Sequence, residues 1–534
     1  MKLMDRREFL KLAGLAGAGV LGGGLAFKSG PSKRPNILFM MSDDHAFQAI
    51  SCYDGRLNST PNIDRLAKDG VRFTSSFCTN SICAPCRAVL LTGKYSHVNG
   101  VIDNAVVFDG SQTTFPKLLQ KAGYRTALFG KWHLKSDPTG FDYWNILPGQ
   151  GDYYNPEMIE MGERKKRQGY VTEIVTDDCL EWLGKRDRSK PFCVLLHHKA
   201  PHRNWQPATK YLGLYADEAK PLPETFADDY ATRSDAARRQ QMRIADHMTL
   251  NSDLKIAPDA TPGDDTPGEA ADRKNYEAML NRMTPEERAA FEEAYRADNE
   301  AFRKANPSGP ELAAWKYQRY IKDYLRCIAS VDESVGRVLD YLEKEDLADD
   351  TLVVYTSDQG FYLGEHGWFD KRFMYEESLR MPLLVRFPKE IPPRIDERDM
   401  VLNLDFAPTF LDYAGVEAPA EMQGRSMRAV LRGKPPKDWR TSVYYHFFEF
   451  PAVHMVKRHF GVRTARYKLI HFYYDIDAWE LYDLEKDPRE LNNVYGDPAN
   501  APIVAELKAE LERLRNRYGD TDEAKFLPKT KEKT

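Results

Sequence analysis

Carboxylate and amide side chains gather at two points of the sequence in a pattern that suits a bound cation. Asp43 and Asp44 are adjacent, and Asp358 is followed by Gln359. An aspartate after a strand is usually a turn former or a helix cap, but two adjacent carboxylates repel each other unless a positive charge offsets them. The four side chains offer only oxygen atoms, which suit Ca²⁺ better than Mg²⁺ and do not suit Zn²⁺. We therefore expect a hard cation here.

A cysteine-containing segment supplies a candidate nucleophile. Residues 83–87 read Cys-Ala-Pro-Cys-Arg, and Leu-Thr-Gly follows at 91–93. Pro85 is typical of the first turn of a helix, and Gly93 of the position just past its end. Cys83 is then expected at a helix N-terminus, where free amides and the helix dipole favour an anion. The pattern is also compatible with an ordinary buried cysteine or with a redox pair formed with Cys86.

Four apolar runs end directly in polar clusters and predict the sheet that positions these residues. The runs are 36–41, 126–129, 192–196 and 351–356, and near-continuous apolar character is typical of parallel strands buried on both faces. The first and last lead into the two acidic pairs, and the others lead into Gly-Lys-Trp-His at 130–133 and a histidine-rich stretch at 197–202. Ligands bind beyond the carboxyl ends of such strands. We therefore expect carboxylates, lysines and histidines to meet at one rim of an α/β fold.

In their order and rough spacing these motifs resemble those of the type I sulfatases, a family of the alkaline phosphatase superfamily. The maturation signature Cys-x-Pro-x-Arg matches residues 83–87, although Cys86 stands where serine is most frequent. Gly-Lys-x-His matches 130–133, Ala-Pro-His matches 200–202, and a lysine follows the late metal pair at Lys371. The resemblance covers nearly the whole mature chain. It implies an alkaline-phosphatase-like α/β/α sandwich with a mostly parallel central sheet and a smaller C-terminal antiparallel α+β subdomain.

The resemblance also implies a mechanism. Cys83 would be oxidised to Cα-formylglycine, whose hydrated aldehyde attacks the sulfur of a sulfate ester. Arg87 would hold this hydrate, and His133 would take its second proton so that sulfate is expelled. The sulfate would be held by Lys131, His202 and Lys371, and His202 or Lys371 would protonate the departing sugar hydroxyl. The implied Ca²⁺ ligands are Asp43, Asp44, Cys83 in its modified form, Asp358, which could also accept the nucleophile's proton, and Gln359.

The residues within and around the motifs indicate a sulfated sugar as substrate. The stretches 197–205, 317–324 and 363–372 are similar to the bacterial branch related to N-acetylglucosamine-6-sulfatases, which implies exo action on 6-O-sulfated N-acetylglucosamine. Iduronate-2-sulfatases share Gly-Glu-His at 364–366, so the motifs are compatible with their specificity too. They also fit a phosphodiesterase or phosphonate monoester hydrolase of the superfamily, or a non-catalytic sulfated-glycan binder. Two roles are open for four further histidines, which either line the sugar pocket or have structural partners: His45, His197, His198 and His366.

The amino terminus predicts export. Arg6-Arg7 precedes an apolar, glycine-rich run at 12–27, and residues 1–30 resemble a bacterial twin-arginine signal peptide. The run is short for a membrane span, and no cysteine before Cys52 could carry a lipid, so no stable membrane anchor is expected. The predicted location is periplasmic or extracellular. Because this route carries folded protein, a formylglycine-generating or anaerobic sulfatase-maturing enzyme would act in the cytoplasm.

The remaining chain predicts a two-part organisation. Residues 34–415 would form the catalytic domain, and 416–534 the C-terminal subdomain with strands at 443–447, 467–470 and 481–484 and a helix at 502–518. A polar stretch at 205–310 would be a helical insertion, either a solvated excursion or a lid over the rim. The net charge of −4, from 76 Lys and Arg against 80 Asp and Glu, gives no indication of a nucleic-acid partner.

Overall fold

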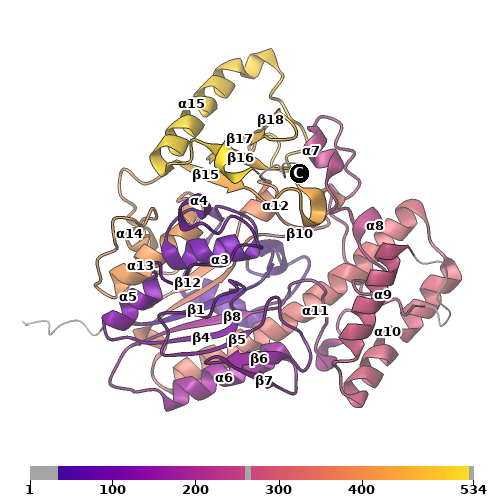
Figure 1. The fold of residues 1–534 in the computed structure, drawn as a ribbon, viewed down its shortest axis with the longest axis horizontal. Coiled ribbons are helices and arrows are strands. Elements are labelled where there is room, and N and C mark those ends of the chain that lie inside the picture. The colour runs from indigo at the N-terminus through magenta and orange to yellow at the C-terminus, as the bar shows by residue number, and fades with distance from the viewer. Residues whose placement is uncertain (1–33, 259–265, 528–534) are drawn as a thin grey trace, which may run out of the picture. The chain divides into compact units, whose positions relative to one another are not determined.

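A ten-stranded sheet runs through the centre of the computed structural model, which describes residues 34–258 and 266–527 (Figure 1). The four predicted apolar runs form its middle. They are adjacent and parallel in the order β9 (Thr351–Ser357), β1 (Asn36–Ser42), β8 (Phe192–His198) and β4 (Arg125–Lys131). The predicted α/β class with a mostly parallel sheet is confirmed. The predicted signal peptide at 1–30 lies outside the described residues.

Shorter strands extend the sheet at both edges and introduce antiparallel pairs. Beyond β9 lie β12 (Leu383–Arg386), β2 (Val71–Phe73) and β13 (Arg394–Asp396), of which β12 is antiparallel to both of its neighbours. Beyond β4 lie β5 (Tyr143–Leu147), β6 (Glu157–Glu160) and β7 (Glu163–Lys166), of which the last two pair antiparallel. The parallel strands that carry the candidate residues thus lie in the interior of the sheet, away from both of its edges.

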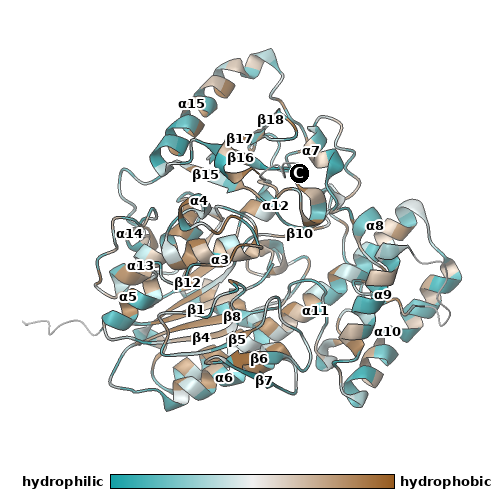
Figure 2. Cartoon of the chain, viewed as in Figure 1, coloured by the Kyte–Doolittle hydropathy of each residue, from teal (hydrophilic) through white to brown (hydrophobic). Residues whose placement is uncertain are grey.

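Helices cover the two faces of the sheet. One face carries α2 (Pro61–Asp69), α6 (Val171–Lys185) and α11 (Gly309–Lys344), and the other carries α3 (Cys83–Thr92), α5 (Phe115–Lys121) and α13 (Phe406–Tyr413). In β1, Leu38 and Met40 enter the core on one face of the sheet, whereas Ile37, Phe39 and Met41 enter the core on the other face. Each fully buried side chain of this size contributes roughly 1.5–3 kcal/mol, so both faces of β1 must be apolar. Figure 2 accordingly shows brown central strands.

The described residues of the stretch predicted as a helical insertion form helices and loops. Its elements are η2 (Thr209–Tyr211), α7 (Asp235–Arg239), α8 (Ile244–His247), α9 (Pro267–Leu280) and α10 (Pro285–Ala305). Helices α9 and α10 begin at capping boxes formed by Thr266 with Glu269 and by Thr284 with Glu287. Both helices are largely teal in Figure 2, in keeping with their polar sequences. Helix α8 packs against the long helix α11.

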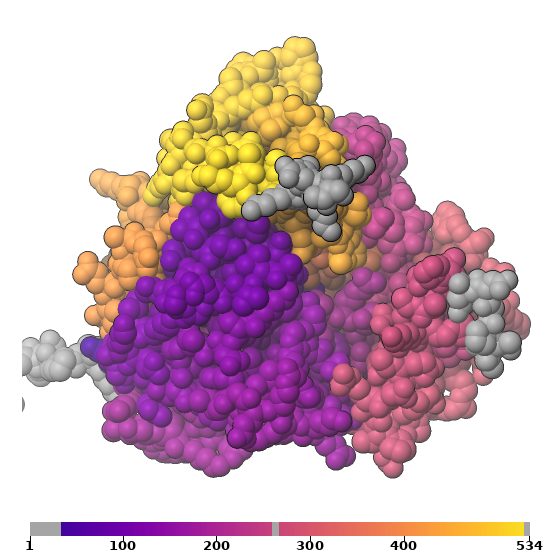
Figure 3. Space-filling view, viewed as in Figure 1, coloured from indigo at the N-terminus to yellow at the C-terminus, as the bar shows by residue number. Residues whose placement is uncertain are grey.

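A second sheet follows near the C-terminus. It contains four antiparallel strands, β15 (Ser442–Phe447), β16 (His459–Thr464), β17 (Tyr467–Phe472) and β18 (Ala478–Asp483), and helix α15 (Ala501–Tyr518) packs on it. The described residues from Pro35 onward form one compact unit. In Figure 3 the yellow C-terminal segment lies against the purple segment that contains α3 and α4 (Ser96–Asn99), where the rings of Tyr95 and Tyr518 meet at 4.5 Å.

Short elements complete the side of the sheet where the candidate residues emerge. They are β3 (Ser76–Phe77) with β14 (Val401–Leu402), β10 (Tyr362–Leu363) with β11 (Phe369–Asp370), and helix α12 (Glu376–Leu379). Helix α14 (Arg428–Leu431) packs against α13. Within the described residues, no helix is long and apolar enough to cross a membrane.

Candidate active site

The two acidic pairs leave the sheet at the same edge. Ser42 at the end of β1 pairs in parallel register with Ser357 at the end of β9, so the residues that follow each strand start side by side. Asp43, Asp44, Asp358 and Gln359 are all fully buried. The backbone N–H of Asp44 donates to Asp358 Oδ1 at 3.2 Å. The rim predicted from the apolar runs therefore brings these four side chains together.

The oxygen atoms of this cluster fit a hard cation. One carboxylate oxygen from each of Asp43, Asp44 and Asp358 lies within 4.8 Å of the others. Gln359 Oε1 is buried and has no hydrogen-bond partner among the described residues. Burial, together with the charges of Asp43 and Asp358, raises the pKa of Asp44 to about 7 against the opposing effect of Lys371. A divalent cation would relieve this repulsion and use the unpaired amide oxygen.

Three basic side chains surround the carboxylates. Arg87 Nη2 lies 3.0 Å from Asp43 Oδ2 and 3.2 Å from Asp358 Oδ2. Lys131, the last residue of β4, pairs with Asp43, and Lys371 Nζ lies 2.6 Å from Asp44 Oδ1. All three are at least 97% buried. A buried group of positive charges beside a cation-binding cluster is able to bind an anion with several oxygen atoms, such as a sulfate group.

Cys83 is the first residue of α3, as predicted. Its Sγ lies 3.4 Å from Asp43 Oδ1 and 4.0 Å from Lys131 Nζ. The helix ends at Gly93, whose φ of 63° is left-handed and whose N–H donates to Val89 O. Burial and the charge of Asp43 raise the pKa of the Cys83 thiol, so an unmodified thiol would be protonated at neutral pH and weakly nucleophilic.

Cys86 lies on the same helix but does not join Cys83. All seven cysteines of the chain lie among the described residues, and all are free. Cys86 Sγ accepts from Asn403 Nδ2 at 3.0 Å and contacts the main-chain oxygen of Asp358. A disulfide between the two residues is therefore not formed, and this geometry gives no support to a redox pair.

The two predicted histidines lie at the same rim. His202 Nε2 is 3.7 Å from Asp44 Oδ2. Burial and the charge of Lys131 lower the pKa of His133 to about 2, so its ring is neutral at neutral pH. Both Asp44 and His133 have left-handed backbones, with φ of 63° and 57°. Such strain in non-glycine residues persists where the surroundings impose it, often at functional sites.

Gly130 explains the first residue of the Gly-Lys-x-His motif. Its φ is 90°, and a Cβ atom added there would lie 2.0 Å from the carbonyl oxygen of His197 on the neighbouring strand β8. Any other residue would push β4 away from β8. Because Lys131 and His133 follow directly, this close approach fixes where both side chains leave the sheet.

The four additional histidines have partners inside the protein. His45 Nδ1 lies 2.6 Å from Tyr355 Oη, His198 Nε2 lies 3.1 Å from Ser334 Oγ, and His366 Nδ1 lies 2.8 Å from Asp228 Oδ2. His197 Nδ1 lies 3.3 Å from the main-chain oxygen of Lys131. None of the four lines the cavity that opens at His202. Their geometry favours a structural role over a place in the sugar pocket.

The cavity beside His202 has a volume of about 640 Å³ and is lined in part by residues that the sequence did not single out. Gln150 Oε1 accepts from Lys131 Nζ at 2.6 Å. Lys199 and Arg203 line the same cavity, and α9 forms its far wall. Gln150 lies in a loop after β5, where no pattern in the sequence marks it. Lys199 directly precedes the Ala-Pro-His motif, and this proximity was the one signal that could have found it.

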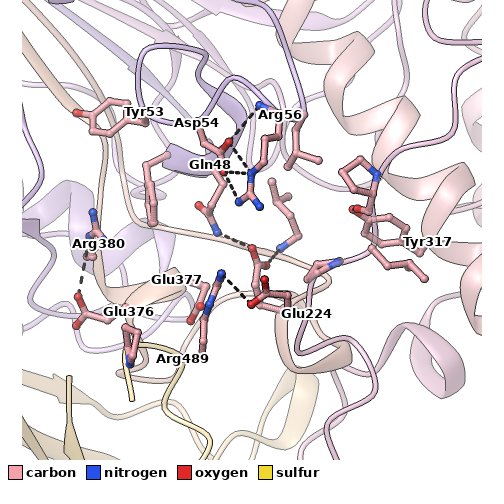
Figure 4. Close-up of a pocket in the computed structure, with 18 residues that line it drawn as sticks. Gln48, Tyr53, Asp54, Arg56, Glu224, Tyr317, Glu376, Glu377, Arg380 and Arg489 are labelled. Atoms are coloured by element: carbon pink, nitrogen blue, oxygen red, sulfur yellow. Dashed lines mark hydrogen bonds and ion pairs between the residues drawn. The ribbon is translucent and has the colours of Figure 1, made fainter. Parts of the chain in front are cut away.

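A second cavity of about 390 Å³ lies elsewhere (Figure 4). Glu377, Arg380, Arg489 and Tyr317 point into it, and Gln48 donates to Glu365 at 3.1 Å. None of the candidate catalytic or metal-binding residues lines it. Of these two cavities, only the one at His202 is lined by a candidate catalytic residue.

The chain matches known protein families along most of its length. The model of the sulfatase family matches residues 35–416, and the model "N-sulphoglucosamine sulphohydrolase, C-terminal" matches residues 364–517. An N-acetylglucosamine-6-O-sulfatase from Bacteroides thetaiotaomicron is 50% identical over 496 residues, 92% of this chain and 88% of that protein.

Solved structures of similar proteins are consistent with these sequence matches. A protein crystallised with its substrate D-glucosamine-2-N,6-O-disulfate superposes with a TM-score of 0.87 at 50% identity, over 92% of this chain and 99% of that one. A phosphonate monoester hydrolase from Silicibacter pomeroyi superposes with a TM-score of 0.66 at 22% identity, over 92% of this chain and 97% of that one, which indicates a shared fold alone. The chain therefore belongs to the sulfatase family of sulfuric ester hydrolases.

Proposed function

We propose that this sulfatase removes the 6-O-sulfate of N-acetylglucosamine, or of its N-sulfated counterpart, at the non-reducing end of a glycan. The observation that carries the substrate assignment is the relative named N-acetylglucosamine-6-O-sulfatase, which is 50% identical over 496 residues that cover 92% of this chain. The solved relative that holds a 6-O-sulfated glucosamine supports the same assignment.

The proposed cofactors are Ca²⁺ and Cα-formylglycine at position 83. Asp43, Asp44, Asp358 and Gln359 would hold the cation, together with residue 83, and the unpaired buried Gln359 Oε1 supports this fit. The cation would supply positive charge near the sulfate oxygens, and formylglycine would supply a hydrated aldehyde with one hydroxyl to attack sulfur and one to release sulfate. A plain serine or cysteine offers only the first of these.

The chain's own residues would position the sulfate and move protons. Lys131, His202 and Lys371 would bind the sulfate oxygens and offset the charge that develops on the leaving oxygen. His202 or Lys371 would protonate the departing sugar hydroxyl. His133 would accept the second hydroxyl proton of the nucleophile. Arg87, paired with Asp43 and Asp358, would orient the nucleophile.

The surroundings of Lys371 support exo action. Its neighbours Asp370 and Arg372 are held by the segment after β15, since His454 Nε2 lies 3.3 Å from Asp370 Oδ2 and Glu449 pairs with Arg372. On the other side, α9 of the insertion bounds the cavity at His202. We propose that residues 205–310 act as a lid and that residues 34–415 and 416–534 together enclose one pocket. Such enclosure would make chain ends better substrates than polymer interiors.

The proposed setting is bacterial export through the twin-arginine route, with maturation in the cytoplasm and action in the periplasm or outside the cell. This proposal rests on the sequence of residues 1–30 alone.

The test is a panel of defined sulfated sugars with release of sulfate measured. The matured enzyme should cleave 6-sulfo-N-acetylglucosamine faster than its 3-sulfo isomer, 2-sulfo-iduronate or 6-sulfo-galactose. Cys83→Ser should fold yet lose multiple turnover, whereas the control Cys86→Ser on the same helix should retain it. Rapid cleavage of an aryl phosphate diester without any sulfate release would refute the proposed reaction.

A further inference from the structure

A third lysine lies close to the sulfate-binding group but has no carboxylate partner. Lys199 is only 5% exposed. Within residues 34–258 and 266–527, no acidic side chain lies within ion-pair distance of its Nζ. The ammonium donates to the main-chain oxygen of Gln150 at 3.2 Å and lies 4.7 Å from the centre of the Tyr153 ring. A buried ammonium group with unused donors is costly, which is the state in which an anionic ligand binds well.

Gln150 connects this lysine to the reaction centre. Its side-chain Oε1 accepts from Lys131 Nζ at 2.6 Å, and its main-chain oxygen accepts from Lys199 Nζ. One residue thus holds two lysines, one directed to the carboxylate cluster and one to the cavity at His202. A substrate with its reacting sulfate at Lys131 would present a second substituent to Lys199.

The groups that face Lys199 agree with an anion site. Burial, with the nearby charge of Lys131, lowers the pKa of Lys199 to about 8, and Asp43 and Asp152 oppose this. Asp152 is itself engaged, since its Oδ2 lies 3.0 Å from Arg282 Nη1. The other acid on the cavity wall, Asp272, accepts from the N–H groups of two residues of the insertion. An incoming anion would therefore meet an ammonium group that has no carboxylate partner among the described residues, and carboxylates that already accept hydrogen bonds.

We propose that Lys199 binds the N-sulfate of a glucosamine whose 6-O-sulfate lies at the reaction centre, and so sets a preference for N-sulfated over N-acetylated substrates. This inference rests on the proposed function, because it assumes the same sugar in the same site. An N-acetyl group offers only a neutral carbonyl oxygen, whereas an N-sulfate offers a full negative charge. Charge-assisted hydrogen bonds are about twice as strong as neutral ones.

The test compares two substrates that differ only at the amino group, D-glucosamine-2-N,6-O-disulfate and 6-sulfo-N-acetylglucosamine. Lys199→Met keeps the aliphatic stem and removes the charge. It should lower kcat/KM for the N-sulfated substrate roughly 10- to 100-fold, the range for one charged hydrogen bond, and leave the N-acetylated substrate nearly unchanged. The matched control is Lys220→Met, which removes another buried lysine, one that pairs with Glu218 away from this cavity. It should leave the ratio of the two substrates unchanged.

A binding measurement keeps the inference separate from the proposed function. Glucosamine-2-N-sulfate has no 6-O-sulfate to lose, so calorimetric titration reports on the Lys199 site without turnover. Tighter binding of this sugar than of N-acetylglucosamine to the unmutated enzyme, and loss of that difference in Lys199→Met, would support the site. Equal binding of the two sugars, or an equal loss of both activities in the variant, would overturn it. Failure to release sulfate from either substrate would refute the proposed function instead.

Discussion

A buried ion pair next to His202 should control both stability and turnover. Asp253 is fully buried and belongs to the insertion. Its oxygens accept from Arg203 Nε at 2.7 Å and Nη2 at 2.6 Å, and from the N–H of Thr249 at 2.9 Å. Arg203 also stacks over the ring of Phe369 at 5.0 Å. The Arg203–Asp253 ion pair therefore links the insertion to the segment that carries His202.

The expected loss can be worked from this geometry. Asp253→Leu leaves a guanidinium group only 23% exposed and without its bidentate partner, which costs about 3–5 kcal/mol of folding free energy. Arg203→Met leaves the carboxylate with its remaining donors, so we expect a smaller loss of about 2–3 kcal/mol. The double variant leaves no unpaired charge. Its loss should fall short of the sum of the two single losses by about 2–3 kcal/mol.

The assay is denaturant unfolding of the four proteins, followed by kcat/KM on a sulfated sugar. Because displacement of a catalytic group by about 1 Å can cost 100-fold, the Arg203→Met variant should also be a slower enzyme. Additive losses of stability would show that the pair is not coupled. Stable variants with unchanged kcat/KM would show that the insertion does not position His202.

Three further predictions concern separate parts of the molecule. Gln359→Leu removes a buried oxygen and should weaken Ca²⁺ binding about tenfold, seen as a smaller rise in melting temperature on adding Ca²⁺; an unchanged rise would contradict the ligand set. Cys86→Ser should still permit modification at position 83, checked by the mass of the peptide that spans it, and an unmodified peptide would show that the cysteine is required. Although burial opposes it, hydrogen bonds to Asp228 and Glu377 raise the pKa of His366 to about 9. The stability that this protonated ring contributes is full below about pH 6.5 and is lost as the pH rises through 9. The melting temperature of His366→Gln should therefore vary less over this pH range than that of the unmutated protein. Identical dependence of the two melting temperatures on pH would refute the ion pair.

The central strands and the clustered residues could be predicted because their sequence patterns follow from burial. Parallel strands covered on both faces must be apolar throughout, so residues 36–41 and 351–356 indicated β1 and β9 directly. The polar residues after them then had to share an edge. The edge strands β6 and β7 were not predicted, since polar residues such as those at 163–166 carry no such pattern.

Other parts depend on contacts that a sequence does not display. Strand β16 was missed because Gly461 interrupts it; a Cβ there would lie 2.4 Å from the carbonyl oxygen of Leu469 on β17, so the glycine reflects close packing and not a turn. Helix α11 begins at Gly309, inside the stretch predicted as the insertion, and continues to Lys344. The partners of Lys131 and Arg203 are loop residues, Gln150 and Asp253, and only the folded chain brings them close.

The most direct test of the account is the initial rate of sulfate release from 6-sulfo-N-acetylglucosamine by enzyme that has been matured and loaded with Ca²⁺. The account predicts steady multiple turnover with the unmutated chain and none above background with Cys83→Ser. Equal turnover by the two proteins would contradict the assignment of the nucleophile, and no turnover by either would contradict the proposed substrate.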